Sequence, residues 1–135
     1  MILGLGNDIV HIDRVEELLK KFGDRFIKRS YTPDEIHGAV RFGANNNIGR
    51  ASYFARRFAA KEAFSKAVGT GFRAGLRFQD IGVINDELGK PHLVLTGKAK
   101  ELVDKMAPKG KKAICHISLC DDYPIAQAIV IISAE

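Results

Sequence analysis

A helix predicted over residues 51–68 constrains the fold of this chain more than any other segment. Successive residues of a helix turn by about 100°, and this rotation gathers several apolar side chains into one arc. The arc comprises Phe54, Ala55, Phe58, Ala59 and Ala63. Gly69 follows the last helical residue and suits the left-handed conformation that ends many helices. We therefore expect this helix to be buried against another layer of the protein.

Glu62 lies inside this apolar arc, between Phe58 and Ala55 on the helical wheel. A carboxylate that leaves water without a partner is costly, so Glu62 needs a cation. Lys66, one turn later, could provide that cation in the orientation that helices favour. A metal ion, or a basic group in a functional site, would serve equally well. Helix geometry alone leaves the two interpretations open.

The remaining segments predict short strands and helices along a chain of 135 residues. Thr32 and Glu35 form a capping box that starts one helix, and Asp13 is placed to cap another that starts at Arg14. Residues 43–49 are expected to form a loop. We expect a further helix and five strands, the helix at 97–107 and the strands at 2–12, 77–86, 92–95, 113–119 and 125–132.

These elements favour a single α+β domain over residues 1–135, with the long buried helix packed on a small, mainly antiparallel sheet. The last strand is apolar on both faces and should be the central, buried one. No apolar run approaches the ~18 residues that cross a membrane, and the first residues do not resemble a signal peptide. With only two cysteines, Cys115 and Cys120, we expect a reducing, cytoplasmic location.

Three further clusters could carry chemistry. Asp8 follows two glycines that would let a ligand or another backbone approach closely, although a turn or cap aspartate is the simpler interpretation. Lys61 and Lys66, with the turn at 69–71, could bind phosphate or could simply end the helix. His116 precedes a serine on a predicted strand, but no third group completes a nucleophile, and a half-buried structural histidine explains it as well.

Four blocks of sequence, taken together, resemble the holo-[acyl-carrier-protein] synthases, the small-subunit group of 4′-phosphopantetheinyl transferases. The blocks are GLGNDIVHIDR (4–14), RRFAAKEAFSKAVGTG (56–71), FQDIGV followed by NDELGKPHL (78–93), and HISLCDD (116–122). Their order and spacing, and the length of the chain, are similar to those of a complete family member. The resemblance is weakest at residues 30–50 and 98–111. It implies the 4′-phosphopantetheinyl transferase fold.

The resemblance implies an enzyme that moves phosphopantetheine from coenzyme A to a serine of apo acyl carrier protein, with 3′,5′-ADP as the other product, in support of fatty acid biosynthesis. It places Mg²⁺, a hard cation that prefers carboxylate and phosphate oxygens, on Asp8 and Glu62. The implied catalytic residues are Asp8, Glu62, Lys66 and His116. Glu62 or a metal-bound water is expected to accept the serine proton, with His116 as the next candidate.

The resemblance also implies a binding site for coenzyme A. The residues expected around its phosphates are Arg57, Lys61, Lys66, Gly69, Thr70 and Gly71. Pro91 and His116 are expected to line the nucleotide. Asp121 and Asp122 depart from the residues that many relatives carry there. Their negative charge would be unfavourable near an anionic substrate unless it points away or supports the metal.

The segment 14–29 carries six Lys and Arg residues against three acidic ones. A solvated helix face would explain this charge, but the resemblance implies a docking surface for an acidic carrier protein. The expected contacts are Arg14, Lys21, Arg25 and Lys28, with Leu18 and Phe26 as apolar neighbours. It further implies a homotrimer with active sites at subunit interfaces, in which Asp8 and Glu62 come from one subunit and part of the nucleotide pocket from its neighbour.

Two other classes of function compete with this interpretation. The net charge of +5 would suit a nucleic-acid-binding domain, but most Phe residues lie in apolar stripes and there is no Trp to stack on bases. We therefore expect no nucleic-acid partner. A metal-dependent phosphodiesterase could use Asp8, Glu62 and His116 on other diphosphates, and it would hydrolyse its substrate without a carrier protein.

Overall fold

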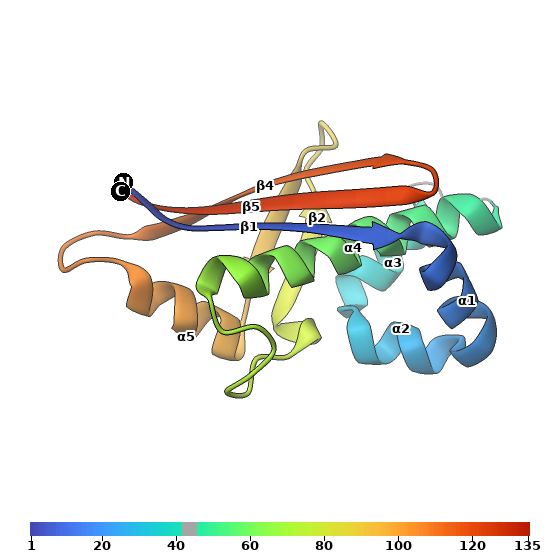
Figure 1. Cartoon of the computed structure of the whole chain (residues 1–135), viewed down its shortest axis with the longest axis horizontal. Helices are drawn as coiled ribbons and strands as arrows, with labels where there is room; N and C mark the ends of the chain where they lie inside the picture. Colours follow the sequence, from blue (N-terminus) through green and yellow to red (C-terminus); the bar gives the residue numbers. More distant parts are fainter. Residues whose placement is uncertain (42–45) are drawn as a thin grey trace.

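The computed structural model of the chain describes residues 1–41 and 46–135 and combines helices with antiparallel strands (Figure 1). In chain order its elements are β1 (Ile2–His11), α1 (Ile12–Phe22), α2 (Asp24–Ser30), α3 (Pro33–Arg41), α4 (Asn47–Val68), the short 3₁₀ helix η1 (Phe78–Asp80), β2 (Ile81–Asn85), β3 (Pro91–Leu95), α5 (Gly97–Met106), β4 (Ala113–Asp122) and β5 (Ile125–Ala134). None of the helices in this part of the chain is long and apolar enough to cross a membrane.

The main sheet has three antiparallel strands in the order β1-β5-β4, so β5 is the central strand, as predicted. Figure 1 shows α4 running along one face of this sheet, with α1, α2 and α3 grouped at one end and α5 at the other. The side chains of β5 that face α4 are fully buried; they are Ala126, Ala128, Val130 and Ile132. The predicted α+β class, a long buried helix on a mainly antiparallel sheet, is confirmed.

The opposite face of the same sheet presents apolar side chains to the surface. Leu5, Ile9 and Ile129 remain 63%, 56% and 38% exposed. They lie together because β1 pairs with β5 in a register that places Leu5 opposite Ile131 and Asn7 opposite Ile129. In a single chain, β5 is therefore central but fully buried on one face only.

Helix α4 is longer than predicted and begins at Asn47 rather than Ala51. The side chain of Asn46 caps it by accepting a hydrogen bond from the amide of Gly49 at 2.6 Å. The expected loop at 43–49 is therefore wrong for its last three residues, while residues 43–45 lie outside the described part of the chain. At the other end Gly69 takes the predicted left-handed conformation, with φ 86°.

Strand β1 packs directly on the backbone of α4. A Cβ at Gly6 would lie 1.8 Å from the carbonyl oxygen of Ala63, and one at Gly4 would lie 2.2 Å from that of Ala67. Only glycine leaves room for so close an approach. The two glycines before Asp8 therefore serve a backbone contact, which was one of the two uses expected for them.

Two local predictions are wrong. Asp13 lies in the first turn of α1 and is not its cap, because the helix already starts at Ile12. Residues 77–80 are not part of a strand, since η1 occupies 78–80 and β2 begins at Ile81. The capping box of Thr32 and Glu35 is confirmed in both directions, at 2.9 and 3.2 Å.

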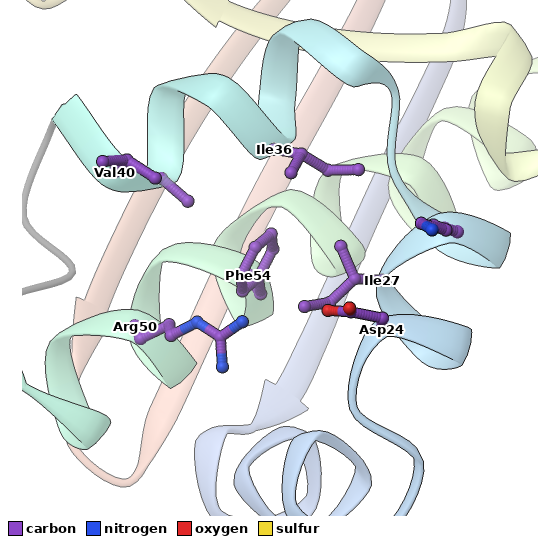
Figure 2. Close-up of a pocket in the computed structure, with 8 residues that line it drawn as sticks. Asp24, Ile27, Ile36, Val40, Arg50 and Phe54 are labelled. Carbon is purple, nitrogen blue, oxygen red and sulfur yellow. The ribbon is translucent and has the colours of Figure 1, made fainter.

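Helices α2, α3 and α4 enclose a cavity of about 440 Å³ (Figure 2). Ile27, Ile36 and Phe54 form its apolar wall, and Asp24 and Arg50 also line it. Although it is the largest of the cavities described here, neither Asp8 nor Glu62 lines it. Its size therefore does not mark it as the site of chemistry.

Candidate active site

Asp8, Glu62 and Lys66 are brought together where β1 crosses α4. The ammonium nitrogen of Lys66 lies 2.8 Å from Asp8 Oδ1 and 3.1 Å from the carbonyl oxygen of Asn7. The side chain of Asp8 is 16% exposed, whereas that of Lys66 is 54% exposed. Lys66 therefore bonds across to the sheet and not back to Glu62. The ion pair of Glu62 with Lys66 within the helix, which could have explained Glu62 without a function, therefore does not form.

Glu62 occupies a half-buried position beside Asp8. Burial raises the pKa of Glu62 above its ordinary value, and the neighbouring Asp8 carboxylate raises it further, while Lys66 acts in the opposite direction. The hydrogen bond from Lys66 to Asp8 raises the pKa of the Lys66 ammonium. Two adjacent carboxylates with one partly exposed ammonium leave negative charge at this point. Such a group of ligands attracts a further cation.

The donor atoms fit Mg²⁺ better than they fit a closed structural metal site. Within residues 1–41 and 46–135 no cluster of three or more His, Cys, Asp or Glu side chains could hold a metal ion. A site built on Asp8 and Glu62 would supply two carboxylates and leave the other positions for water and substrate oxygens. Mg²⁺ is commonly bound in this way, through one or two carboxylates together with substrate phosphates.

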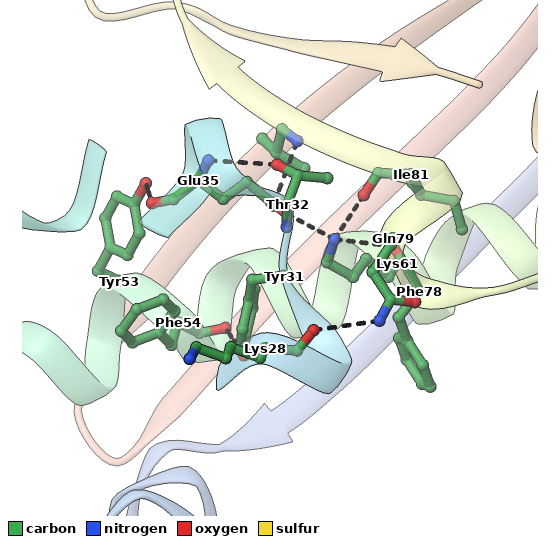
Figure 3. A network of polar contacts seen from close by, with 11 residues as sticks. Lys28, Tyr31, Thr32, Glu35, Tyr53, Phe54, Lys61, Phe78, Gln79 and Ile81 are labelled. Carbon is green, nitrogen blue, oxygen red and sulfur yellow. Dashed lines mark hydrogen bonds and ion pairs between the residues drawn. The ribbon is translucent and has the colours of Figure 1, made fainter. Parts of the chain in front are cut away.

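Lys61 does not lie at this site, which corrects the prediction that it contacts a phosphate. Its side chain is fully buried on the other side of α4, where its ammonium bonds to Glu35 Oε1 at 2.7 Å (Figure 3). The carbonyl oxygens of Phe78 and Ile81 accept its two other hydrogen bonds. Burial lowers the pKa of Lys61, and the Glu35 carboxylate opposes that effect. No donor of Lys61 is left for a ligand.

Arg57 also points away from Asp8 and Glu62, contrary to the expectation that it adds charge to their site. It is 2% exposed, its guanidinium lies 3.6 Å from the centre of the Tyr53 ring, and it bonds to Asn85 Oδ1 at 3.4 Å. Its buried Nε has no hydrogen-bond partner among residues 1–41 and 46–135. Arg57 lines a separate cavity of about 160 Å³ with His37, Arg41 and Asn85.

Pro91 belongs to the neighbourhood of Arg57. It starts β3 and pairs with Asn85 across the hairpin of β2 and β3. The expected nucleotide residue Pro91 and the expected phosphate residue Arg57 thus converge on Asn85. The spacing of residues along the chain did not predict that Asn85 would contact Arg57.

The Gly69-Thr70-Gly71 turn follows α4 directly, one turn beyond Lys66. The amide of Gly69 bonds to the carbonyls of Ser65 and Lys66, and the hydroxyl of Thr70 bonds to the carbonyl of Gly71 at 2.8 Å. Both glycines have positive φ, and a Cβ would meet nothing within 4 Å at either position. Their role in the fold is thus a left-handed turn, and the space around them is open.

His116 lies on the opposite face of the sheet from Asp8. It pairs with Ile131 in β4–β5, and Ile131 pairs with Leu5 on the exposed apolar face. The imidazole Nε2 lies 2.9 Å from the Ser133 hydroxyl. Because Asp8 and its partner Ala128 face α4, the structure of one chain does not bring His116 to the two carboxylates.

A second cavity, of about 300 Å³, opens between α1, α2 and the middle of α4. It is lined by Leu18, Phe22, Arg25, Phe26, Arg29, Ser30, Phe58 and Phe78. Three of the predicted carrier-binding residues, Leu18, Arg25 and Phe26, are therefore found around one hollow, and Arg14, Lys21 and Lys28 lie on the same two helices, outside its lining. Phe58 stands one helical turn before Glu62, which places this cavity next to the carboxylates.

The unusual aspartates after His116 do not add charge to the carboxylate site. Asp121 forms an ion pair with Arg56 at 3.0 Å. Asp122 pairs with Ile125 at the far end of β4, next to the turn into β5. The negative charge of Asp121 is thus compensated by Arg56.

The chain is similar to known proteins in sequence and in structure. Residues 4–128 match the family model described as "4′-phosphopantetheinyl transferase superfamily". A protein of Parvibaculum lavamentivorans named "Holo-[acyl-carrier-protein] synthase" is 50% identical over 133 residues, covering 98% of this chain and 96% of that protein.

Two solved structures illustrate the similarity in fold. The crystal structure of holo-[acyl-carrier-protein] synthase from Neisseria meningitidis has a TM-score of 0.81 at 38% identity, and the match covers 98% of this chain and 99% of that one. The structure of the Helicobacter pylori enzyme in complex with coenzyme A has a TM-score of 0.77 at 31% identity, with 96% and 99% covered.

Proposed function

This chain belongs to the 4′-phosphopantetheinyl transferase superfamily, and we propose that it is a holo-[acyl-carrier-protein] synthase. It transfers 4′-phosphopantetheine from coenzyme A to a serine of apo acyl carrier protein and releases 3′,5′-ADP. The observation that carries this proposal is the joining of Asp8, Glu62 and Lys66 at one place in a chain whose relatives match it from end to end. The holo carrier it makes would serve fatty acid biosynthesis.

Asp8 and Glu62 are the residues that would hold Mg²⁺. When bound, this ion supplies positive charge to the phosphate oxygens, on which negative charge accumulates during transfer. The two carboxylates are already adjacent, and the raised pKa of Glu62 marks the electrostatic strain that a cation would relieve. The packing of Gly4 and Gly6 on α4 keeps Asp8 beside Glu62.

The chemical step is a displacement at phosphorus. The hydroxyl oxygen of the carrier serine forms a bond to the phosphorus that bears pantetheine, and the bond from that phosphorus to the bridging oxygen breaks. The bridging oxygen leaves with 3′,5′-ADP and keeps the electron pair. Glu62 is the residue that would take the serine proton, because its carboxylate lies at the site of transfer. Lys66 can leave Asp8 to neutralise a phosphate, since its side chain is long and half exposed.

The residues expected to bind coenzyme A lie in two separate parts of the structure. Lys66 contacts Asp8, and the turn at 69–71 follows one helical turn later, while Arg57 and Pro91 adjoin the separate cavity around Asn85. Arg57 brings a positive guanidinium to the lining of that cavity, which suits a phosphate of the nucleotide end. Lys61 is withdrawn from the proposal because its ammonium is fully satisfied within the core.

A homotrimer would reunite the separated parts of the site. The exposed apolar face of the sheet, with Leu5, Ile9 and Ile129, is a surface of the kind that subunits cover. His116 lies on that same face, so it would meet a neighbouring subunit and could line the neighbour's nucleotide pocket. We propose that Asp8 and Glu62 of one subunit act with His116 of the next.

The cavity between α1, α2 and α4 is the proposed docking place for the carrier protein. Its walls are aromatic, and Arg25 and Arg29 are among the residues that line it. Arg14, Lys21 and Lys28 would extend the positive surface toward an acidic partner. Phe22, Arg29, Phe58 and Phe78 join the expected contacts Leu18 and Phe26. The enzyme would act in the cytoplasm, in agreement with its two free cysteines.

Intact-protein mass spectrometry tests the reaction. Apo acyl carrier protein is incubated with the purified protein, coenzyme A and Mg²⁺, and a parallel sample contains EDTA. A mass gain of one phosphopantetheine that needs both protein and Mg²⁺ is expected. Hydrolysis of coenzyme A without carrier should be negligible, whereas rapid hydrolysis without any carrier modification would instead indicate a phosphodiesterase. Unmodified carrier with a folded protein would contradict the proposal.

A further inference from the structure

The buried ion pair of Glu35 and Lys61 stands out from every other ion pair in the described chain. Both side chains are 0% exposed, and they join α3 to α4 (Figure 3). Each of the other pairs has at least one side chain with a quarter or more of its surface exposed. Burying two charges is costly, and a hydrophobic pair of similar volume is often as stable. Stability alone therefore does not explain this pair.

The pair binds the backbone of two elements, η1 and β2, and of the residue that precedes α3. Lys61 donates to the carbonyls of Phe78 in η1 and Ile81 at the start of β2. Glu35 Oε1 accepts from the amide of Thr32, and Oε2 accepts from the amide of Val83 in β2 at 3.2 Å. An apolar pair could fill the same space but could not form any of these directional bonds.

Lys61 itself and two residues that the pair binds, Phe78 and Val83, lie next to parts of the proposed active site. Glu62 follows Lys61 directly, so holding Lys61 on one side of α4 fixes the direction in which Glu62 leaves the helix. Phe78 stacks on Phe58 at 5.3 Å, and both line the cavity proposed for the carrier. Val83 lies two residues before Asn85, which binds Arg57 in the separate cavity.

We propose that Glu35 and Lys61 are positioning residues that set the carboxylate site, the carrier cavity and the Asn85 cavity relative to one another. The proposal rests on the function proposed above and assigns these two residues no contact with substrate. Lys61 acts through Glu62 and Phe78, and Glu35 acts through Val83. In this respect the KE sequence at 61–62 combines a positioning residue with a metal ligand.

The test is the double change Glu35→Leu with Lys61→Met, which removes both charges and nearly keeps the volume. A single change of either residue to an apolar one would leave a buried charge without a hydrogen-bond partner and could unfold the chain. The matched control is Val103→Ala, a core change on α5 that lowers stability and removes none of the hydrogen bonds of Glu35 and Lys61. All proteins are assayed well below their melting temperatures, after circular dichroism has confirmed the fold.

The readouts are Mn²⁺ affinity by electron paramagnetic resonance, coenzyme A affinity by calorimetry, and kcat and KM for transfer. We expect the folded double variant to bind Mn²⁺ at least about tenfold more weakly and to lose about 100-fold in kcat/KM, because a displacement of about 1 Å is enough to do so. Val103→Ala should bind both ligands like the wild type. A folded double variant within about twofold of wild type in binding and turnover would overturn the proposal.

If the double variant does not fold, Glu35→Gln decides. Its amide oxygen can still accept from Lys61 and Thr32, but its NH₂ group cannot accept from the amide of Val83. Coenzyme A should then bind several-fold more weakly while Mn²⁺ affinity stays unchanged, and unchanged coenzyme A binding would overturn the proposal. A wild-type protein that binds both ligands but modifies no carrier would contradict the proposed function alone, since the binding differences are measured without transfer.

Discussion

The ammonium group of Lys66 lies 2.8 Å from the carboxylate of Asp8, a residue 58 positions away, although Glu62 stands only one helical turn before it. Lys66 thereby places a positive charge on one of the two proposed metal ligands. Binding of a metal ion to Asp8 would displace this ammonium and free it for the substrate. Lys66 would then bind Asp8 when the metal ion is absent and the substrate when the metal ion is present.

Lys66→Met should therefore have opposite effects on metal binding and on catalysis. Without coenzyme A, Mn²⁺ should bind a few-fold more tightly, because a competing ammonium is gone; the gain is limited to about 1 kcal/mol because the side chain is half exposed. Transfer should fall by about 100-fold, because a charged contact to phosphate is lost. Titration with Mn²⁺ and steady-state kinetics measure the two effects. Lys66→Arg, which keeps the charge, is the control, and weaker Mn²⁺ binding to Lys66→Met would contradict the exchange.

Glu62→Gln should stabilise the metal-free protein at neutral and alkaline pH while abolishing transfer. Burial and Asp8 raise the pKa of Glu62 in the folded state, so the folded protein binds this proton more tightly than the unfolded chain. The ionised carboxylate therefore destabilises the fold above its raised pKa, and this effect disappears as the pH falls through that pKa. Urea unfolding at a series of pH values should show the advantage of the variant shrinking toward acid pH. An advantage that grows toward acid pH would contradict the assignment.

The sequence predicted Asp8 and Glu62 because their patterns are local. Two glycines marked the close approach of β1, and the helical wheel placed Glu62 among apolar residues; both features are seen in the structure. The resemblance, and not the wheel, placed Lys61 and Arg57 around the phosphates, and in the structure both side chains are buried away from Asp8. Helix α4 is buried on most of its circumference. The position of a residue on the helical wheel therefore does not reveal whether its side chain faces a ligand or the protein core.

The sequence predicted only one role for Glu35, in the capping box with Thr32. Its second role, binding Lys61 and the amide of Val83, depends on contacts across 26 and 48 residues, which no local sequence pattern predicts.

His116 shows a different limit of prediction from sequence. Strand alternation placed it correctly on one face, but sequence periodicity could not tell that Asp8 would point to the other face of the same sheet.

Gly6→Ala should separate β1 from α4. The new methyl group would lie 1.8 Å from the Ala63 carbonyl oxygen, so the strand must move. We expect a loss of about 1–3 kcal/mol in the free energy of unfolding and a larger loss of transfer, because Asp8 moves away from Glu62. Gly82→Ala is the control, since its methyl group would meet neighbours only at 3.5 Å or more. Denaturation and kinetics measure both, and equal behaviour of the two variants would contradict the role of the contact.

Arg25→Glu should weaken use of the carrier protein more than binding of coenzyme A. Arg25 lines the aromatic cavity between α1 and α2, where a reversed charge would repel an acidic partner. We expect the KM for carrier to rise about tenfold or more and its dependence on salt to decrease. Lys111→Glu, an exposed change in the loop before β4, is the control for net charge. An equal rise in KM for both substrates would place Arg25 at the coenzyme A site instead.

Mixed oligomers would test whether Asp8 and His116 act across subunits. Asp8→Ala and His116→Ala should each be nearly inactive alone, because each removes one side of every site. Co-expressed subunits carrying one change each would regain activity, since about one site in four of a randomly mixed assembly would join an intact Asp8 to an intact His116. Two affinity tags isolate the mixed oligomers before assay. Because the two residues lie on opposite faces of the sheet within one chain, the absence of any recovery in these isolated oligomers would contradict a shared site.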